Sequence, residues 1–418
     1  MKKIMLIGVL ILLAACGNVQ LTEEQEIFLA DFDFMVELIQ ENYPFMSLVD
    51  RRFAQNSMDE LANLRESLIR AFGQEEDYLV FYEHMRQGLR AIFHDVGHLT
   101  LFPPDFLGVD DPSGVEFVFV HDFREQPIEI PELTFEFPIN DSVHTEIIEE
   151  GRIALVEMDS FLLPLTSAVN SQLRMFLAQI NNYEHIIIDI RNNSGGRVEL
   201  PAILFIAPNI REPIVLDEFA FITAGELAIH AEEFYRFDDF SMFNDEIFPP
   251  SMTLEMRSGF RNTNRLFNAV PARQLVETYN LTGMNEQDLE NFEYGFRILT
   301  QIQPMSSIFG IAPGPFMNNA NIWVLTGSDS TSAADAFAHL AREAGFTLVG
   351  EPTGGVVGCG RAYFLLPRTG FVLQMDTFYT TDGVGRAFEE FTVEPHYFSR
   401  AGMDALETVL AIIAERGF

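Results

Sequence analysis

The sequence predicts an α/β protein with a helical region at its N-terminal end, and two patterns support this prediction. From Thr22 to about Ile92, apolar residues recur at three- and four-residue steps, which is the spacing of amphipathic helices. Beyond Leu99, short apolar runs of strand length alternate with helical stretches. Strands and helices that alternate over short links are typical of a parallel sheet covered by helices.

The N-terminal helices are expected within residues 17–100, as a small helical domain. Residues 28–39 and 58–72 carry the clearest apolar periodicity. Tyr43-Pro44 is expected to end the first helix, because proline lacks the N–H group that a helix interior needs and restricts the residue before it.

Residues 101–418 are expected to form the second domain, which contains the sheet. Three continuous apolar runs, typical of strands buried on both faces of a parallel sheet, lie at 186–190, 322–325 and 347–349. Shorter strands and two helices are expected at 116–120, 134–137, 153–158, 171–180 and 333–344. Residues 226–319 lack clear periodicity and are expected to form an insertion that covers the core.

Residues 1–16 are predicted to be an export signal. Two lysines precede an apolar run from Ile4 to Leu13, which is too short to span a bilayer core of roughly 30 Å. Leu13-Ala14-Ala15-Cys16 resembles the bacterial lipobox, in which the cysteine is lipidated and becomes the new N-terminus. We therefore expect an extracytoplasmic lipoprotein tethered to the membrane through Cys16, with ordinary secretion after cleavage near Ala15 as the alternative.

The composition narrows the classes of function. The chain has 418 residues, with 26 Lys+Arg, 62 Asp+Glu and a net charge of −36. Nucleic acid is disfavoured as a partner, because a chain this acidic repels phosphate. Two cysteines cannot form a disulfide framework. Lys2 and Lys3 are the only lysines and lie in the export signal, so the mature protein has no lysine to act as a base.

A loop with two glycines, residues 189–196, follows the first buried run and reads Asp-Ile-Arg-Asn-Asn-Ser-Gly-Gly. Two glycines let the backbone turn sharply and expose its N–H groups. Those amides either stabilise an oxyanion or only make a turn. A phosphate-binding loop is disfavoured because no Lys-Ser/Thr pair follows.

Ser332 lies where the second buried run passes into a helix. In one interpretation it caps the helix together with Asp335, and its side chain binds only backbone amides. In the other it is a nucleophile, with the Ala333 amide and the helix N-terminus facing the developing negative charge. The pattern alone leaves both interpretations open.

His94 and His98 close the helical region and allow three interpretations. Histidines four residues apart suggest a zinc site, but Gly97 lies inside the helix that such a motif requires and no third ligand is evident. One histidine at the domain junction is also a candidate general base. In the third interpretation, both are ordinary polar residues at a helix end.

Glu389 and Glu390 lie within residues 386–395, which are expected to form a strand. Because consecutive strand residues point to opposite faces, only one of these carboxylates would face a site. Taken in isolation, neither residue indicates a function.

In this order, the motifs resemble those of the C-terminal processing (tail-specific) serine peptidases and their tricorn-core relatives. The Asp-x-Arg-x-Asn-x-Gly-Gly of that family matches residues 189–196, its Ser-Ala-x-Glu matches 332–335 with Asp335 in place of Glu, and its Gly-x-x-Thr-x-Gly matches 350–355. The resemblance covers residues from about 42 to 395. It implies a crotonase/Clp-protease-like ββα core and a serine peptidase that needs no metal or cofactor.

The resemblance also implies roles for particular residues. One branch of the family has a lysine base at the position of Val356, and the lack of lysine excludes that branch. The tricorn-like branch takes its base from a histidine in the N-terminal part and supports it with a glutamate near the C-terminal end. By position these are His98 and Glu389, which would activate Ser332 as the nucleophile. The implied oxyanion donors are the backbone amides of Ala333 and of Gly195 or Gly196.

The chain departs from the family pattern in ways that keep alternatives open. Gly97 stands where the tricorn type has a serine, and residues 392–396 differ from the usual Gly-Val-x-Pro-Asp. Only about fifty residues separate His98 from Ile153, too few for the PDZ domain of the lysine branch. The expected substrate is a peptide or protein. The alternatives are a catalytically silent lipoprotein that binds peptides or apolar ligands, and a zinc peptidase through His94 and His98.

Overall fold

The computed structural model describes residues 21–72, 78–104, 118–119, 143–162, 168–225, 266–304, 320–356 and 359–416. The expected export signal with Cys16, the expected strand at 134–137 and residues 226–265 and 305–319 of the expected insertion lie outside the described residues.

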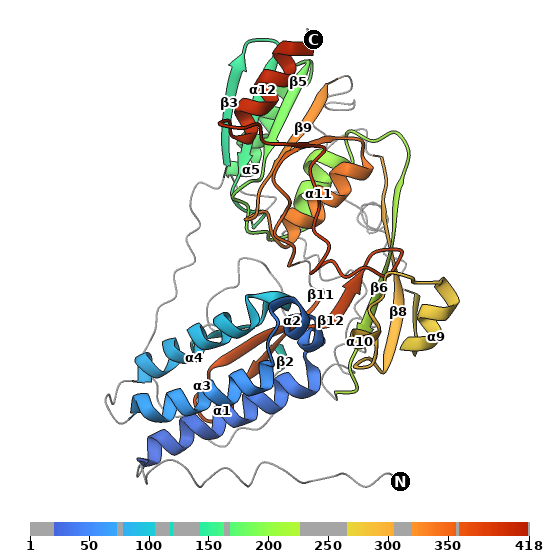
Figure 1. The fold of residues 1–418 in the computed structure, drawn as a ribbon. Helices are drawn as coiled ribbons and strands as arrows, with labels where there is room; N and C mark the ends of the chain where they lie inside the picture. Colours follow the sequence, from blue (N-terminus) through green and yellow to red (C-terminus); the bar gives the residue numbers. More distant parts are fainter. Residues whose placement is uncertain are drawn as a thin grey trace.

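Helices form the N-terminal part of the molecule, as the apolar periodicity predicts (Figure 1). They are α1 (Glu23–Asn42), α2 (Met46–Phe53), α3 (Ser57–Phe72) and α4 (Tyr78–Phe93), followed by the short 3-10 turn η1 (Val96–His98). A capping box starts α1: the Thr22 hydroxyl accepts from the Gln25 N–H, and the Gln25 side chain accepts from the Thr22 N–H. The helix ends at Asn42, just before Tyr43-Pro44.

A seven-stranded sheet lies against these helices (Figure 1). Its strand order is β2-β11-β12-β6-β8-β7, with β1 pairing with β12 as well. Its strands are β1 (Thr100–Phe102), β2 (Val118–Phe119), β6 (Ile214–Ile222), β7 (Leu266–Pro271), β8 (Tyr294–Ile302), β11 (Cys359–Leu365) and β12 (Val372–Thr381). Helices α9 (Ala272–Tyr279) and α10 (Glu286–Leu289) connect β7 to β8. The described part of the expected insertion, 266–304, therefore extends this sheet.

The second sheet has six strands, in the order β13-β10-β9-β5-β4-β3. Its neighbours are parallel except for the antiparallel pair β3–β4. The strands are β3 (Val143–Glu149), β4 (Ile153–Met158), β5 (His185–Asp189), β9 (Asn321–Thr326), β10 (Thr347–Gly350) and β13 (Tyr397–Phe398). The predicted parallel strands at 186–190, 322–325 and 347–349 are confirmed as β5, β9 and β10.

Helices cover both faces of this second sheet. Alternate strand residues point to opposite sides, so each face has apolar side chains to bury. Apolar residues of one face pack with α5 (Ala168–Gln179), α11 (Ala333–Glu343) and the helical stretch formed by α6 (Glu199–Pro201) and η3 (Ala202–Ile206). Residues of the other face, including Trp323, pack against α12 (Ala405–Arg416). The predicted α/β class is thereby confirmed.

The N-terminal helices and the seven-stranded sheet share one hydrophobic cluster. Phe32 and Met35 of α1 and Leu89 of α4 belong to the same cluster as Leu373 and Met375 of β12. The apolar faces of the helices are therefore buried on the sheet, which holds the end of the helical region close to β12. The predicted domain boundaries at residues 17, 100 and 101 remain predictions.

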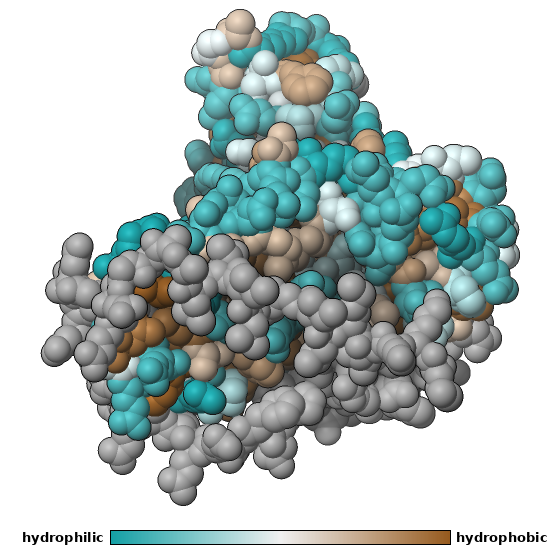
Figure 2. All heavy atoms as spheres, turned by 60° about the horizontal axis from the view of Figure 1, so that its bottom comes forward, coloured by the Kyte–Doolittle hydropathy of each residue, from teal (hydrophilic) through white to brown (hydrophobic). Residues whose placement is uncertain are grey.

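On the face shown in Figure 2, hydrophilic side chains cover most of the described surface. This agrees with the 62 Asp+Glu residues of the sequence. None of the helices in the described part of the chain has the length and apolar character needed to cross a membrane.

Candidate active site

Three side chains from distant parts of the sequence meet in one chain of polar contacts. His98 Nε2 lies 3.1 Å from Ser332 Oγ, and His98 Nδ1 lies 2.6 Å from Asp376 Oδ2. Because a carboxylate accepts hydrogen bonds, its contact places the ring proton on Nδ1 and leaves Nε2 free to accept from the serine hydroxyl. The structure therefore brings together two residues that the sequence singled out, Ser332 and His98, and adds Asp376.

Ser332 occupies the sharp passage from the β9 loop into α11. Its backbone has φ 56° and ψ −121°, and such a positive φ costs free energy for a residue with a Cβ. Its N–H donates to the Gly355 carbonyl at 2.8 Å, and its side chain makes no capping hydrogen bond. The helix-cap interpretation is therefore wrong: the hydroxyl points to His98.

The turn before His98 is also in an unusual backbone conformation. α4 ends at Phe93, and His94, Asp95, Gly97 and His98 all have positive φ. Tyr43 Oη donates to the Val96 carbonyl at 2.9 Å, which ties the turn to the end of α1.

Strand β1 begins two residues after His98, at Thr100. The Gln374 side chain of β12 donates to the His98 carbonyl at 2.9 Å, and Thr100 pairs with Gln374 across the two strands. These contacts hold His98 next to β12. Asp376 lies in the same strand, two residues after Gln374.

Asp376 is fully buried in β12, a strand whose residues are all buried. It belongs to none of the motifs that the sequence shows. The one available signal was a charged residue inside a run of apolar and small polar residues, since a buried strand rarely carries an unpaired carboxylate. Its partner His98 is 278 residues away in the chain, so the pairing could not be read from local spacing.

Glu389 does not contact the imidazole, which corrects the prediction that it supports His98 directly. Residues 388–390 form a turn and not the expected strand. The side chain of Glu389 is buried, and its Oε1 accepts from the Gly97 N–H at 3.3 Å, one residue before His98. Burial and the nearby charge of Asp376 raise the pKa of Glu389 to about 8. A carboxyl with such a pKa carries a proton at neutral pH.

The two glycines of the 189–196 loop have different surroundings. The Gly195 N–H donates to Asn193 Oδ1 at 2.8 Å, which argues against the Gly195 amide as an oxyanion donor. Gly195 has φ +101°, and a Cβ there would lie 2.6 Å from Ser332 Cβ, so only glycine fits against the serine. The adjacent Gly196 is exposed, and a bridge with Phe161 uses the carbonyl of Gly195 and the amide of Arg197 on either side of it.

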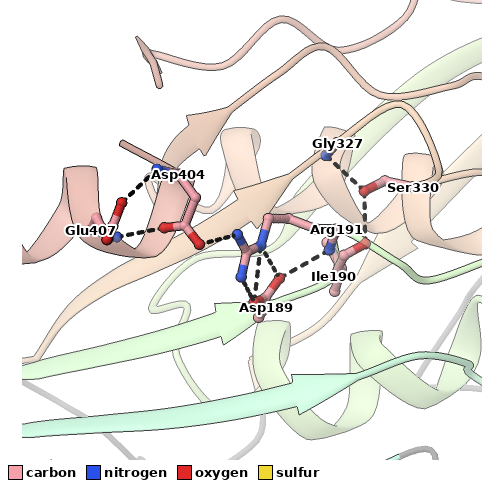
Figure 3. A network of polar contacts seen from close by, with 7 residues as sticks. All are labelled: Asp189, Ile190, Arg191, Gly327, Ser330, Asp404 and Glu407. Carbon is pink, nitrogen blue, oxygen red and sulfur yellow. Dashed lines mark hydrogen bonds and ion pairs between the residues drawn. The ribbon is translucent and has the colours of Figure 1, made fainter. Parts of the chain in front are cut away.

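Asp189 and Arg191 of the same motif hold this loop to the far end of the chain (Figure 3). Arg191 Nη2 lies 2.7 Å from Asp189 Oδ2, and Nη1 lies 3.0 Å from Asp404 Oδ2, at the start of α12. Ser330 Oγ donates to the Ile190 carbonyl at 2.7 Å and thereby joins the β5 and β9 loops. In these contacts Asp189 and Arg191 position the loops and do not face the hydroxyl of Ser332.

Asp335, the second residue of the cap interpretation, lies in the first turn of α11. It is fully buried, and its Oδ1 accepts from the Thr353 hydroxyl. Burial raises the pKa of Asp335 to about 7, and the Thr353 hydrogen bond offsets part of this effect. Thr353 Oγ1 in turn accepts from the Val393 N–H at 2.8 Å, so Asp335 anchors the turn that follows β10.

His94 is exposed and stacks on Phe53, with ring centroids 3.8 Å apart. The two nitrogens of His98 face Ser332 and Asp376, so the histidines do not converge on a common point. Among the described residues, no three His, Cys, Asp or Glu side chains are grouped to hold a metal ion. This geometry speaks against the zinc interpretation.

Comparisons with known proteins show the family of the chain. The sequence profile of Peptidase family S41 matches residues 152–219 and 261–398, which include the 189–196 loop, Ser332 and Asp376 but begin after His98. The chain belongs to this peptidase family. No curated protein matches the sequence.

Solved structures are similar over nearly the whole chain at low identity. Mature CPAF has 11% identity and a TM-score of 0.51, over 90% of this chain and 93% of that one. The photosystem II D1 C-terminal processing protease has 13% identity and a TM-score of 0.36, over 90% and 93%. A lipoprotein from Streptococcus agalactiae has 11% identity and a TM-score of 0.42, over 96% and 99%. The likeness to CPAF supports the fold.

The buried carboxyl of Glu389 makes the stability of the protein depend on pH. Its ordinary pKa is 4.5 and burial raises it to about 8, so between these values the folded state binds more protons than the unfolded chain and stability falls as pH rises. Glu389→Gln removes this dependence. Relative to wild type, the variant should gain up to about 5 kcal/mol between pH 4.5 and 8, at about 1.4 kcal/mol for each unit of pKa.

Urea unfolding at a series of pH values measures this difference. The exposed Glu394, changed to Gln, is the matched control for removal of a carboxyl and should follow wild type. A stability difference between Glu389→Gln and wild type that stays constant with pH would contradict the protonated state of Glu389.

Proposed function

We propose that the protein is a serine peptidase in which Ser332, His98 and Asp376 form the catalytic relay. The observation that carries the proposal is the pair of contacts on one imidazole, 3.1 Å to the serine hydroxyl and 2.6 Å to a buried carboxylate. A serine hydroxyl is a weak nucleophile until an adjacent base takes its proton, and a base in turn needs a group that fixes its tautomer. Membership of a peptidase family supports peptide bonds as the substrate.

The reaction follows from the positions of the protons. As Ser332 Oγ bonds to the scissile carbonyl carbon, its proton passes to His98 Nε2, and Asp376 stabilises the imidazolium that results. His98 then gives this proton to the leaving amine as the carbon–nitrogen bond breaks. A water molecule, deprotonated by the same nitrogen, attacks the acyl-enzyme and releases the second product, which returns the proton to Ser332.

The oxyanion formed in each step needs hydrogen-bond donors beside Ser332. Ala333 is the first residue of α11, where backbone N–H groups have no acceptor within the helix and the helix dipole favours negative charge. Of the two glycines, Gly196 is the better second donor, because the amide of Gly195 already binds Asn193. Each such donor typically lowers the activation barrier by about 3 to 4 kcal/mol.

The expected place of action is outside the cytoplasm, at a membrane surface. The proposal depends on residues 1–16, whose short apolar run and Leu13-Ala14-Ala15-Cys16 are typical of a lipoprotein signal. Lipidation of Cys16 would tether the peptidase, with peptides or proteins outside the cell membrane as its substrates.

Replacing the nucleophile gives the first test. Ser332→Ala should abolish hydrolysis of a fluorogenic peptide that wild type cleaves, because it removes the hydroxyl that lies 3.1 Å from His98 Nε2 and acts as the nucleophile. The thermal midpoint should stay within a few degrees of wild type or rise, since alanine removes one half-buried hydroxyl. Cleavage at the wild-type rate would refute the assignment of Ser332.

The two buried carboxyls near His98 can be separated by a matched pair of variants. Asp376→Asn should lower kcat about 1,000-fold or more, because an amide no longer holds the imidazole in the required tautomer. Glu389→Gln keeps an oxygen for the Gly97 N–H and should cost less than about 10-fold. Both are measured by steady-state kinetics on the same peptide. A larger loss in Glu389→Gln than in Asp376→Asn would assign the supporting role to Glu389.

A further inference from the structure

We propose that Arg51 and Arg52 of α2 are positioning residues that hold the His98–Asp376 contact in register with Ser332. The proposal rests on the peptidase function proposed above. Both arginines come from the helical region, yet their side chains bind groups outside it. Two chains of contacts lead from them, one to the turn that carries His98 and one to the strand that carries Asp376.

The first chain of contacts starts at Arg52. Its Nη1 donates to the Glu389 carbonyl at 2.6 Å, which holds the turn at residues 388–390 against α2. The Glu389 side chain then accepts from the Gly97 N–H at 3.3 Å. Gly97 directly precedes His98, so the backbone of the base is tied to α2 through a single intermediate residue.

The second chain starts at Arg51. Its two Nη atoms each donate to a carboxylate oxygen of Asp288 in α10, at 2.7 and 3.1 Å. Nη2 also donates to Glu390 Oε2 at 2.8 Å. Tyr379 Oη donates to the same Asp288 carboxylate at 2.6 Å. Tyr379 lies three residues after Asp376 in β12, so this chain ends on the strand that orients the base.

Aromatic packing closes the space between the two chains. Phe45, the residue before α2, stacks on Tyr379 with ring centroids 5.3 Å apart. The same ring lies against Gly97, where a Cβ would come within 2.5 Å of it. Phe45 therefore links the start of α2 directly to both the His98 turn and β12.

The Arg51–Asp288 pair is suited to fix a geometry. Asp288 is fully buried, whereas pairs such as Arg70–Glu66 and Arg400–Glu415 lie in side chains exposed to solvent. A planar guanidinium that binds a carboxylate through two nitrogens fixes direction as well as distance. A buried pair of this kind contributes little net stability but specifies one arrangement.

The relay needs positioning residues because its members come from distant parts of the chain. His98 comes from the end of the helical region, and Ser332 comes from the second sheet, 234 residues later. A shift of about 1 Å between reacting groups lowers rates by about 100-fold. The alignment of the relay therefore depends on how α2 sits on β12 and on the 388–390 turn.

Arg65 provides a matched control within the same helical region. It binds Asp33 through two nitrogens at 2.6 and 2.8 Å, but this pair joins only α3 and α1. Arg65→Met should leave kcat unchanged. Arg52→Met and Arg51→Lys should each lower kcat about 10-fold, with KM within about two-fold of wild type, because a small misplacement affects the reacting groups and not peptide binding. In both variants Asp288 still faces a positively charged side chain at position 51, so both should fold.

A second readout does not need peptidase activity. The proton between His98 Nδ1 and Asp376 should give a low-field proton NMR signal, which His98→Ala assigns by its loss. This signal should shift or broaden in Arg52→Met and Arg51→Lys and remain in place in Arg65→Met.

The outcomes separate the two proposals. A wild-type protein that cleaves no peptide would refute the peptidase function, and the NMR signal would still test the positioning role. An unchanged signal together with an unchanged kcat in both variants would overturn the role of Arg51 and Arg52. Equal changes in Arg65→Met would also overturn it, because they would show a general loss of stability.

Discussion

The contact between His98 and Ser332 is the interaction on which the rest of the structure depends. The two residues belong to different layers, and neither is in a relaxed backbone conformation: φ is 51° at His98 and 56° at Ser332. Such conformations persist only where the surroundings determine them. Here the surroundings are Tyr43, Gln374 and Glu389 around the histidine turn, and Gly355 beside the serine.

The buried carboxyls around this contact have different tasks because their partners differ. Asp376 has an imidazole as its partner, whereas the one hydrogen bond of the Glu389 side chain within the described part of the chain comes from the Gly97 amide. Two adjacent carboxylates cannot both ionise cheaply in a buried site. With its raised pKa, the buried Glu389 carboxyl is protonated at neutral pH and adds no negative charge beside the contact between His98 and Asp376.

Much of the fold could be predicted from the sequence, and the site could be predicted in part. The strands at 186–190, 322–325 and 347–349 were visible because continuous apolar runs mark strands buried on both faces. Ser332 and His98 were visible through their motifs, which are local. Asp376 was not, because its partner is 278 residues away and β12 has no turn or glycine signal at that point. Residues 388–390 form a turn and not the predicted strand, because their contacts, to Arg52 and Gly97, come from the helical region.

The reaction of the protein with a fluorophosphonate probe tests the central claim most directly. Such a probe bonds only to a serine whose proton can be taken by an adjacent base. The account predicts one labelled residue in wild type, Ser332, identified by mass spectrometry of the digested protein, and no labelling of a folded His98→Ala variant. Labelling of a different serine, or equal labelling of Ser332 without His98, would contradict it.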